Sequence, residues 1–353
     1  MFDLQDTIST RVAHVLAPSL ESGDRRRLTG IGGTRNVDAY QFYLAARHQA
    51  QGIRAAGLTK SIELYQKAIA LDPAYALAYA GVAESNRRMI FGADAEPKVV
   101  FESANRNARR AIALDPDLAE CHASLAWNQF WNGWDWAQAE KTFRHAIALN
   151  ANEVNAHFGL SQLLETLRRS DEAIVELHTA RELDPLSLIL LTLESGSIFW
   201  SGRRDEGRER LQRVFDIEPD FWVAHLTLGA MFNADRKLDE AIESMEHADR
   251  LADGSTQAAA ALGFLLAKNG YLDRARQLLA RFDDTQKTHF VPPTSFGLIH
   301  AGLGDIEAVL AALERGYEAR DVRMTLVRGD GRWSLVWKEP RYAALMQRMK
   351  LPV

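Results

Sequence analysis

The sequence of 353 residues predicts an all-α solenoid of about eight stacked helix pairs with a C-terminal cap. Two observations predict it. The positions that close successive units, Ala151, Pro185, Pro219 and Asp253, follow one another at intervals of 34 residues. Each unit carries two segments whose apolar residues recur at three- and four-residue spacing, which is typical of amphipathic helices. A fixed period of this length indicates a solenoid, because one helix pair cannot bury its apolar faces without neighbours.

The clearest unit spans residues 154–185. Small residues at Ala173 and Ala180 let the two helices of the pair approach closely, and Leu177 fills the space between them. Asp184-Pro185 ends the second helix. The pair also offers the next helix a capping residue followed by a proline, which is favoured at the start of a helix. The apolar faces of the two helices consist of Ala156, Leu160, Leu163 and Leu164, then Ala173, Ile174, Leu177 and Ala180.

This unit resembles the tetratricopeptide (TPR) repeat, a helix–turn–helix motif of 34 residues. Leu160-Ser161 stands where the TPR signature has Leu-Gly, Ala173 and Ala180 occupy its small positions, and Pro185 is its closing proline. The resemblance implies a right-handed superhelix in which the first helix of each pair lines an inner, concave surface.

Residues 1–36 precede the array. In residues 2–17 the apolar side chains fall largely on one face, which predicts an amphipathic helix that covers a surface. Residues 18–36 contain four glycines and the run Arg25-Arg26-Arg27, which predicts a solvated linker. Contact of the arginine run with phosphate is the alternative.

The array is predicted over residues 37–317. Its first helix begins at Val37 and its second ends before Pro73. The next closing positions, Pro116 and Ala151, follow after 43 and 35 residues, so the second repeat has nine extra residues and the third has one. We expect these insertions at residues 87–97 and 133–136, as longer turns that leave the helices in phase.

The fifth repeat fits the pattern least, with Glu194 in an aliphatic position and Gly207 in an alanine position. It is predicted to be the least rigid junction of the array. An eighth pair is expected at residues 292–317. Residues 318–353 leave the pattern and predict a terminal cap that ends in a short helix from Glu339 to Met349.

Composition excludes several classes of function. A formal charge of −5 and a pI near 6.1 give no basic field for nucleic acid. The single cysteine, Cys121, excludes an intramolecular disulfide, and no apolar run is long enough to span a bilayer. The N-terminus lacks a secretory pattern, so a cytoplasmic protein is expected. No phosphate-binding, dinucleotide-binding, zinc-protease or serine-nucleophile motif occurs, and we expect neither catalysis nor a cofactor.

Three of the ten histidines, His122, His157 and His225, share one repeat position and suggest a metal site at first sight. Equivalent positions in stacked repeats lie about one helix pair apart, too far for a single ion with bonds of about 2 Å. We therefore expect these histidines to pack in the structure and expect no metal.

The TPR resemblance assigns positions 2, 5, 9, 12 and 13 of each first helix to the inner surface. Many of these positions are aromatic here, and aromatic side chains are the usual anchors of protein and peptide recognition. The alternative is that several rings pack on neighbouring helices or beneath the N-terminal helix. The predicted partner-binding groove consists of Arg87, Arg88, Trp127, Phe130, Trp131, Phe158, Gln162, Phe199, Trp200, Asn233 and Phe264.

Two longer segments resemble a narrower group. Residues 3–20 followed by residues 36–47 are similar to the junction between a TolB-like domain and a TPR array in bacterial regulators, and residues 298–352 are similar to the end of such arrays. In that group a winged-helix, nucleotide cyclase or kinase domain precedes the array. The resemblance implies a scaffold or sensor that binds a protein or peptide partner in a signalling or transcription-regulatory system. The alternative is the detached regulatory half of a cyclase or DNA-binding regulator, and homo-oligomer formation is left open.

Overall fold

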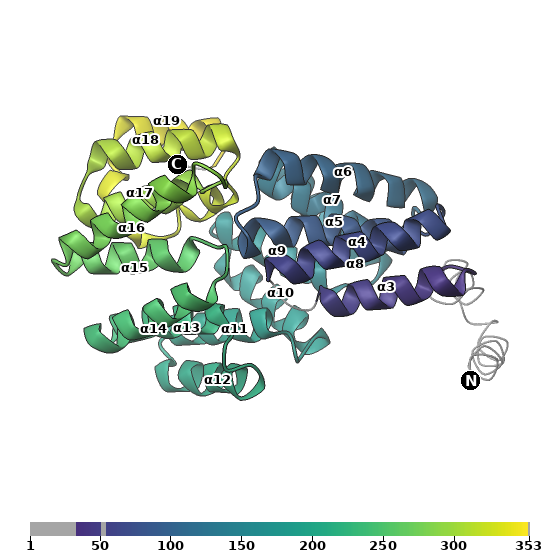
Figure 1. Ribbon diagram of the computed structural model, residues 1–353, viewed down its shortest axis with the longest axis horizontal. Helices are drawn as coiled ribbons and strands as arrows, with labels where there is room; N and C mark the ends of the chain where they lie inside the picture. Colours follow the sequence, from purple (N-terminus) through teal and green to yellow (C-terminus); the bar gives the residue numbers. More distant parts are fainter. Residues whose placement is uncertain (1–32, 51–53, 352–353) are drawn as a thin grey trace.

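The computed structural model describes residues 33–50 and 54–351 (Figure 1). Within these residues the chain forms eight helix pairs and no strand, as the repeat period predicts. The predicted amphipathic helix at residues 2–17 and nearly all of the predicted linker lie outside the described residues. The pairs are α3 (Val37–Gln49) with α4 (Ala55–Leu71), α5 (Ala76–Gly92) with α6 (Pro97–Leu114), α7 (Ala119–Asn128) with α8 (Trp136–Leu149), α9 (Val154–Thr166) with α10 (Ser170–Leu183), α11 (Leu188–Trp200) with α12 (Arg204–Ile217), α13 (Trp222–Ala234) with α14 (Leu238–Leu251), α15 (Gln257–Lys268) with α16 (Leu272–Thr285), and α17 (Pro293–Leu303) with α18 (Ile306–Ala319).

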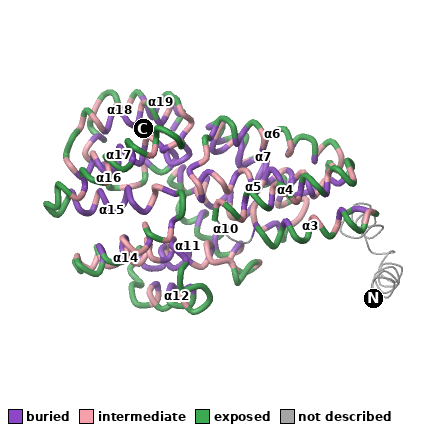
Figure 2. The backbone as a smooth tube through the Cα atoms, viewed as in Figure 1, coloured by how far each residue is buried: buried purple, intermediate pink, exposed green. Residues whose placement is uncertain are grey.

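Three of the turns between repeats share the same side-chain hydrogen bond. Asp72, Asp115 and Asn150 each follow a second helix, and each side chain accepts a hydrogen bond from the backbone N–H two residues further on, at 3.0, 3.2 and 3.0 Å. Such Asx turns satisfy backbone donors where a helix ends and redirect the chain into the next repeat. Although in the first pair α4 has more buried residues than α3, in most pairs the first helix is the more buried member. Figure 2 shows this for α15 and α17, whereas α12 is largely exposed or half-buried.

The nine extra residues of the second repeat lengthen helices, and the expectation of a longer turn is wrong. Helices α5 and α6 have 17 and 18 residues, against 13 and 14 in α9 and α10, and only four residues separate them. The segment after Arg87 is rich in residues that favour helix, and Pro97 takes the first helical position of α6, where its missing N–H costs nothing.

The expectation of a longer turn is also wrong for the third repeat, where a π-helix, η1 (Gln129–Gly133), absorbs the single extra residue directly after α7. Insertion of one residue into an α-helix is the usual origin of a π-bulge. Trp134 then adopts a left-handed backbone with φ of 50°, and the Asp135 carboxylate caps α8 by accepting from the Gln138 N–H at 3.3 Å. After this insertion, Trp134 and Trp136 contact the C-terminal part of the chain, at Tyr317 and Met349.

The two weak positions of the fifth repeat are well packed. A Cβ at Gly207 would lie 2.8 Å from the Phe199 nitrogen and 2.8 Å from the Ser195 carbonyl oxygen, so glycine allows α11 and α12 to approach more closely than alanine would. The buried Glu194 carboxylate accepts from Arg210 Nη1 at 2.9 Å and from Arg181 Nε at 3.2 Å, which links the fourth and fifth repeats.

The C-terminal segment covers the last repeat with two 3₁₀ helices, η2 (Val322–Leu326) and η3 (Gly331–Val336), and with α19 (Pro340–Arg348), which lies where a last helix is predicted. Met324, Trp333, Val336 and Met346 of this segment are buried in a core shared with α17 and α18. The same segment also reaches the second and third repeats, so the superhelix closes on itself (Figure 1). Solenoid repeats ordinarily contact only their sequence neighbours, and the repeat pattern did not predict this closure.

Candidate functional site

The eleven residues of the predicted groove divide into two sets in the structure. Five are buried by the chain itself, so their prediction as exposed groove residues is corrected. The other six are half-buried or exposed and remain candidates for partner contact. The buried set is Arg87, Trp127, Phe130, Trp131 and Phe199, and the accessible set is Arg88, Phe158, Gln162, Trp200, Asn233 and Phe264.

The buried set centres on Trp127, whose side chain is 0% exposed. Its ring centroid lies 4.5 Å from Trp131, 5.6 Å from Phe143 and 5.5 Å from Phe158. Gly159 makes room for this cluster, since a Cβ there would lie 2.2 Å from the Phe143 ring. Offset and edge-on pairs of this kind add about 0.5–1.5 kcal/mol each beyond area burial. The aromatic run of the third repeat is thus mainly a core, as the alternative interpretation of the sequence proposed.

Arg87 completes this core as a buried cation. Its guanidinium carbon lies 4.3 Å from the Trp127 ring centroid and 5.3 Å from that of Trp131, and its Nε donates to Glu84 at 2.8 Å. A cation that is stacked on aromatic faces and paired with a carboxylate is satisfied in low dielectric. Arg87 is therefore part of the buried core and not of an exposed groove.

The closing contacts lie just after the inner positions of the third repeat, at Trp134 and Trp136. Trp136 Nε1 donates to the Met349 carbonyl oxygen at 2.9 Å, and the Arg320 guanidinium lies 4.3 Å from the Trp134 ring centroid. These partners are separated by 213 and 186 residues (349 minus 136, and 320 minus 134). Repeat periodicity carries no information on contacts at such separations.

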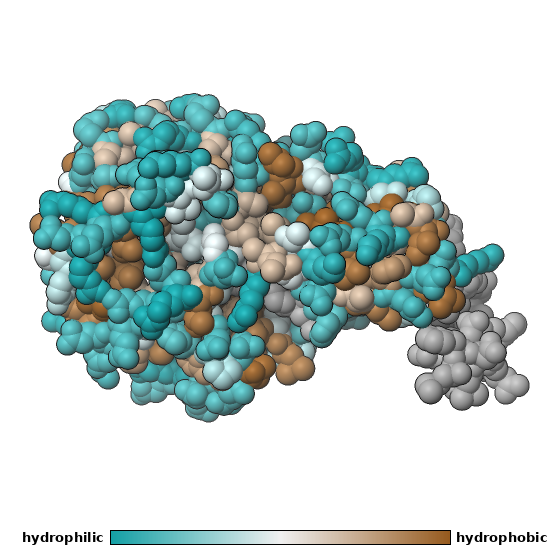
Figure 3. All heavy atoms as spheres, in the orientation of Figure 1, coloured by the Kyte–Doolittle hydropathy of each residue, from teal (hydrophilic) through white to brown (hydrophobic). Residues whose placement is uncertain are grey.

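The accessible set runs along the first helices of the second and the fourth to seventh repeats. Trp200 ends α11 and is 59% exposed, the most exposed of the eight tryptophans. Its ring stands edge-on to Phe199 at 4.7 Å, which holds its orientation from the buried side. Phe158 and Phe264 are half-buried on α9 and α15, beside the main core. Figure 3 shows several hydrophobic patches on this face, one near α15 and others over the start of α6 and over the N-terminal helices.

Carboxylates gather where the second to fourth repeats meet. Glu153 precedes α9 and is 7% exposed, and its Oε1 accepts from the Asn155 N–H at 3.3 Å. Burial, together with the nearby charges of Glu120 and Glu84, raises the pKa of Glu153 to about 8. Arg88, on α5 beside them, donates through Nη1 to the Ala50 carbonyl oxygen. Sequence reasoning missed Glu153, because a helix-capping glutamate gives no sign of being buried.

The three histidines share a structural role that the sequence only partly indicated. The Nε2 atoms of His122, His157 and His225 lie 2.8, 3.0 and 2.8 Å from the carbonyl oxygens of Pro116, Ala151 and Pro219. Each ring thus ties a first helix to the turn before it. The described residues contain no group of three or more histidine, cysteine, aspartate or glutamate side chains arranged to hold a metal ion. No described helix is both long enough and apolar enough to cross a membrane.

Solved structures with the same fold include a chain of the APC/C hetero-tetramer Cut9–Hcn1. It superposes with a TM-score of 0.60 at 13% identity, over 92% of this chain and 59% of that chain. The fold is a TPR solenoid. Yeast Tom70 matches with a TM-score of 0.48 at 14% identity, over 89% of this chain and 68% of that one. YrrB, described as a TPR protein with an unusual peptide-binding site, matches with a TM-score of 0.31 at 21% identity, over 53% of this chain and 90% of its own.

Neither a protein-family model nor a curated protein sequence matches this chain. The prediction of an all-α TPR solenoid with about eight pairs and a C-terminal cap is confirmed by the fold and by its structural neighbour. The narrower resemblance to arrays of bacterial regulators stays a prediction.

Proposed function

We propose that this TPR array is a protein-binding module and that its partner lies along the accessible inner set on the fourth to seventh repeats. The observation that carries the proposal is the exposure of Trp200, 59%, when six of the other seven tryptophans are buried. An exposed tryptophan held by a buried neighbour combines a large apolar surface with low ordering cost, and such residues dominate binding energies at interfaces.

Inner positions on other first helices supply the polar part of the proposed recognition surface. Gln162 is half-buried and Asn233 is exposed, and their side-chain amides can both donate to and accept from a backbone. Phe158 and Phe264 offer half-buried apolar surface on either side. This mixture suits a peptide segment or helix that places apolar side chains against the rings and its polar groups against the amides.

The setting of this binding follows from the sequence resemblance. We propose a scaffold or sensor of a bacterial signalling or transcription-regulatory system, in the cytoplasm and without catalysis of its own. An effector domain on another part of the same protein, or on the partner, would supply the output. The detached regulatory half of a cyclase or DNA-binding regulator is the second form of this proposal and predicts the same binding surface.

The experiment that tests the proposal compares Trp200→Ala with Trp337→Ala. Both tryptophans are exposed, at 59% and 42%, but Trp337 lies in the C-terminal cap, away from the inner positions. Partners are captured from a lysate of the source organism with the wild-type array and identified by mass spectrometry, and their affinity for each variant is then measured. We expect Trp200→Ala to weaken binding by ~30-fold, equivalent to ~2 kcal/mol, and Trp337→Ala to leave it unchanged. Equal affinities for wild type and Trp200→Ala would contradict this site.

A further inference from the structure

The two ends of the array meet at a seam that is separate from the stacking of successive repeats. On one side lie residues 90–136, from the end of α5 to the start of α8. On the other side lie the start of α15, the end of α18, η2 and the residues after α19. Both insertions that break the 34-residue period between Pro73 and Asp253 fall on this seam: the longer α5–α6 hairpin carries Asp94, and the π-helix carries Trp134 and Trp136 to it. The residues inserted into the second and third repeats thus form contacts that close the superhelix.

Asp94 is the centre of the polar contacts across the seam. It is 3% exposed and has a left-handed backbone, with φ of 45°. Its Oδ2 accepts from the N–H and the hydroxyl of Thr256, both at 2.6 Å, and its Oδ1 accepts from Arg323 Nη2 at 2.6 Å. Asp94, Thr256 and Arg323, here called the latch, join the second, seventh and C-terminal parts of the chain. In the closed seam these three donors replace the water that the Asp94 carboxylate would otherwise bind.

The hydrogen bonding of Arg323 in the latch is incomplete. Arg323 is 8% exposed, and its Nε and Nη1 have no hydrogen-bond acceptor among the described residues. Trp134 Nε1, on the opposite side of the seam, also has none within those residues. Buried donors without acceptors favour states in which water reaches them, so they offset part of the closing energy. A buried ion pair likewise gives specificity more than net stability, because both charges lose their hydration.

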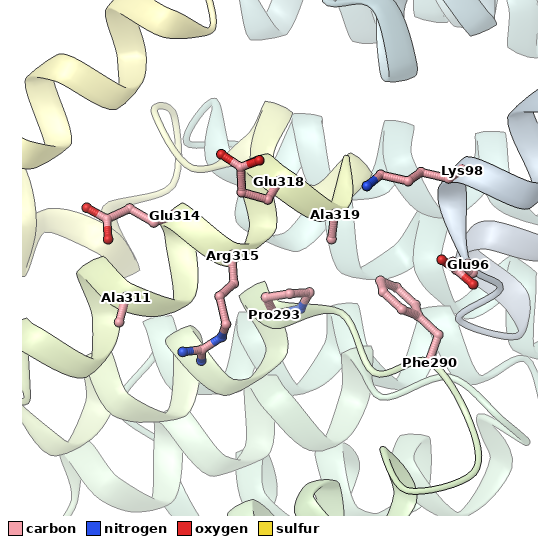
Figure 4. A pocket seen from close by; sticks show the side chains of 9 residues that line it. All are labelled: Glu96, Lys98, Phe290, Pro293, Ala311, Glu314, Arg315, Glu318 and Ala319. Carbon is pink, nitrogen blue, oxygen red and sulfur yellow. The ribbon is translucent and has the colours of Figure 1, made fainter.

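The seam is only partly packed. Beside the latch lies a cleft of about 610 Å³ between the start of α6 and the α17–α18 pair (Figure 4). Glu96 and Lys98 line it from one side, and Arg315, Glu318 and Ala319 line it from the other. In Figure 4 the Lys98 side chain extends toward α18. Apolar side chains, among them Phe290 and Pro293, line the cleft together with these charged ones. The cleft leaves space between distant repeats, whereas α17, α18 and the cap share a continuous apolar core.

From these observations we propose that the latch controls an equilibrium between a closed and an open superhelix. In the closed state the latch and the Trp136–Met349 hydrogen bond join the second and third repeats to the C-terminal part of the array. In the open state the second and third repeats separate from the seventh and eighth repeats, which keep their cap. The proposal does not depend on the partner site at Trp200, because none of the three latch residues belongs to that site.

The test measures the distance across the cleft by double electron–electron resonance between two nitroxide spin labels. Glu96→Cys and Glu318→Cys place nitroxide labels on its two walls, and both positions are exposed. The native Cys121 does not compete for label, because its side chain is 0% exposed and burial raises the pKa of its thiol. The decisive variant is Asp94→Asn, which removes the charge of the latch, keeps an acceptor for Thr256 and tolerates the left-handed backbone.

We expect one short distance in the labelled parent, and in Asp94→Asn a ~10-fold larger fraction of molecules at longer distances, with helicity unchanged. The control is Arg341→Gln, which breaks exposed ion pairs to Glu307 and Glu314 within the C-terminal part and should leave the distances as in the parent. Arg323→Gln, a second latch variant, should act as Asp94→Asn does. Unchanged distances in both latch variants would overturn the proposal. Loss of helicity together with the longer distance would also overturn it, because the contact would then be part of the global core.

Discussion

Among single residues, Glu153 is a buried carboxylate whose pKa lies far above its usual value. Burial and the charges of Glu120 and Glu84 raise its pKa from 4.5 to about 8. The folded protein therefore holds this proton more tightly than the unfolded chain does. The stability that follows is fully present below pH 4.5 and is lost as the pH rises from 4.5 to about 8.

Replacing Glu153 by Gln should remove this pH dependence. The amide keeps an oxygen that accepts from the Asn155 N–H but carries no charge. We expect Glu153→Gln to raise the free energy of unfolding by ~2 to 4 kcal/mol at pH 8 and to leave it nearly unchanged at pH 4.5. Urea titrations of both proteins at the two pH values measure this difference. Glu165→Gln, at an exposed position of the same repeat, is the control, and an equal response of both variants would show that Glu153 has no special environment.

The tryptophans allow a second residue-scale prediction. Trp131 is 6% exposed and touches Trp127 and Phe91, whereas Trp200 is 59% exposed. Trp131→Ala should therefore cost ~3 to 5 kcal/mol as a buried aromatic truncation, and Trp200→Ala should stay within ~0.5 kcal/mol of the parent. Chemical denaturation of the two variants measures both values. Similar losses in the two would mean that Trp200 is packed in solution.

The repeat register predicted which residues face inward, but burial at those positions was not predictable. Trp127 and Trp200 occupy inner positions of two first helices, so periodicity treats them alike. Their exposure differs because Trp127 lies in a cluster with Phe143 and Phe158, in the repeat that the C-terminal segment reaches, while nothing described covers Trp200. Burial here depends on which side chains the adjacent helices place against each inner position, and the repeat period alone does not give that.

On the scale of helices, a glycine can decide how closely two helices pack. In the fifth repeat, a Cβ at Gly207 would meet backbone atoms of α11 at 2.8 Å, whereas a Cβ at Gly196 would meet only Thr227 Cγ2 at 3.9 Å. Gly207→Ala should force α11 and α12 apart and cost ~1 to 3 kcal/mol. Gly196→Ala should instead stabilise α11 by ~0.5 to 1 kcal/mol, since alanine loses less backbone entropy in a helix. Thermal melting of the matched pair tests both signs, and a stabilising Gly207→Ala would refute the close approach.

Helix boundaries followed from the sequence where the repeat is regular and failed where residues are inserted. The start at Val37 and the last helix near residues 339–349 agree with the structure to about one residue. The insertion at residues 87–97 was expected to lengthen a turn, yet it adds about one turn to each of two helices. Sequence arithmetic gives the number of extra residues, while their conformation depends on what they meet, here the seam at Asp94.

For the whole molecule, closure changes how stability is shared. In an open solenoid each repeat is coupled only to its neighbours, so a local defect weakens with distance along the array. Here the eighth repeat and its cap contact the second and third repeats directly, through Arg323 with Asp94 and Met349 with Trp136. Repeats that are far apart in sequence should therefore unfold together.

Leu310→Ala tests this coupling, because Leu310 lies on α18 and is 2% exposed. The truncation should cost ~2 to 5 kcal/mol locally. Hydrogen exchange read by mass spectrometry should then show faster exchange in α6 and η1 as well as in α17 and α18, while α12, which is closer in sequence, changes less. The reason is that opening the eighth repeat releases η2 and Met349 from the seam, whereas α12 packs in a separate core with α11 and α13. A loss of protection that declines steadily from the eighth repeat toward the first would show that the array behaves as an open solenoid.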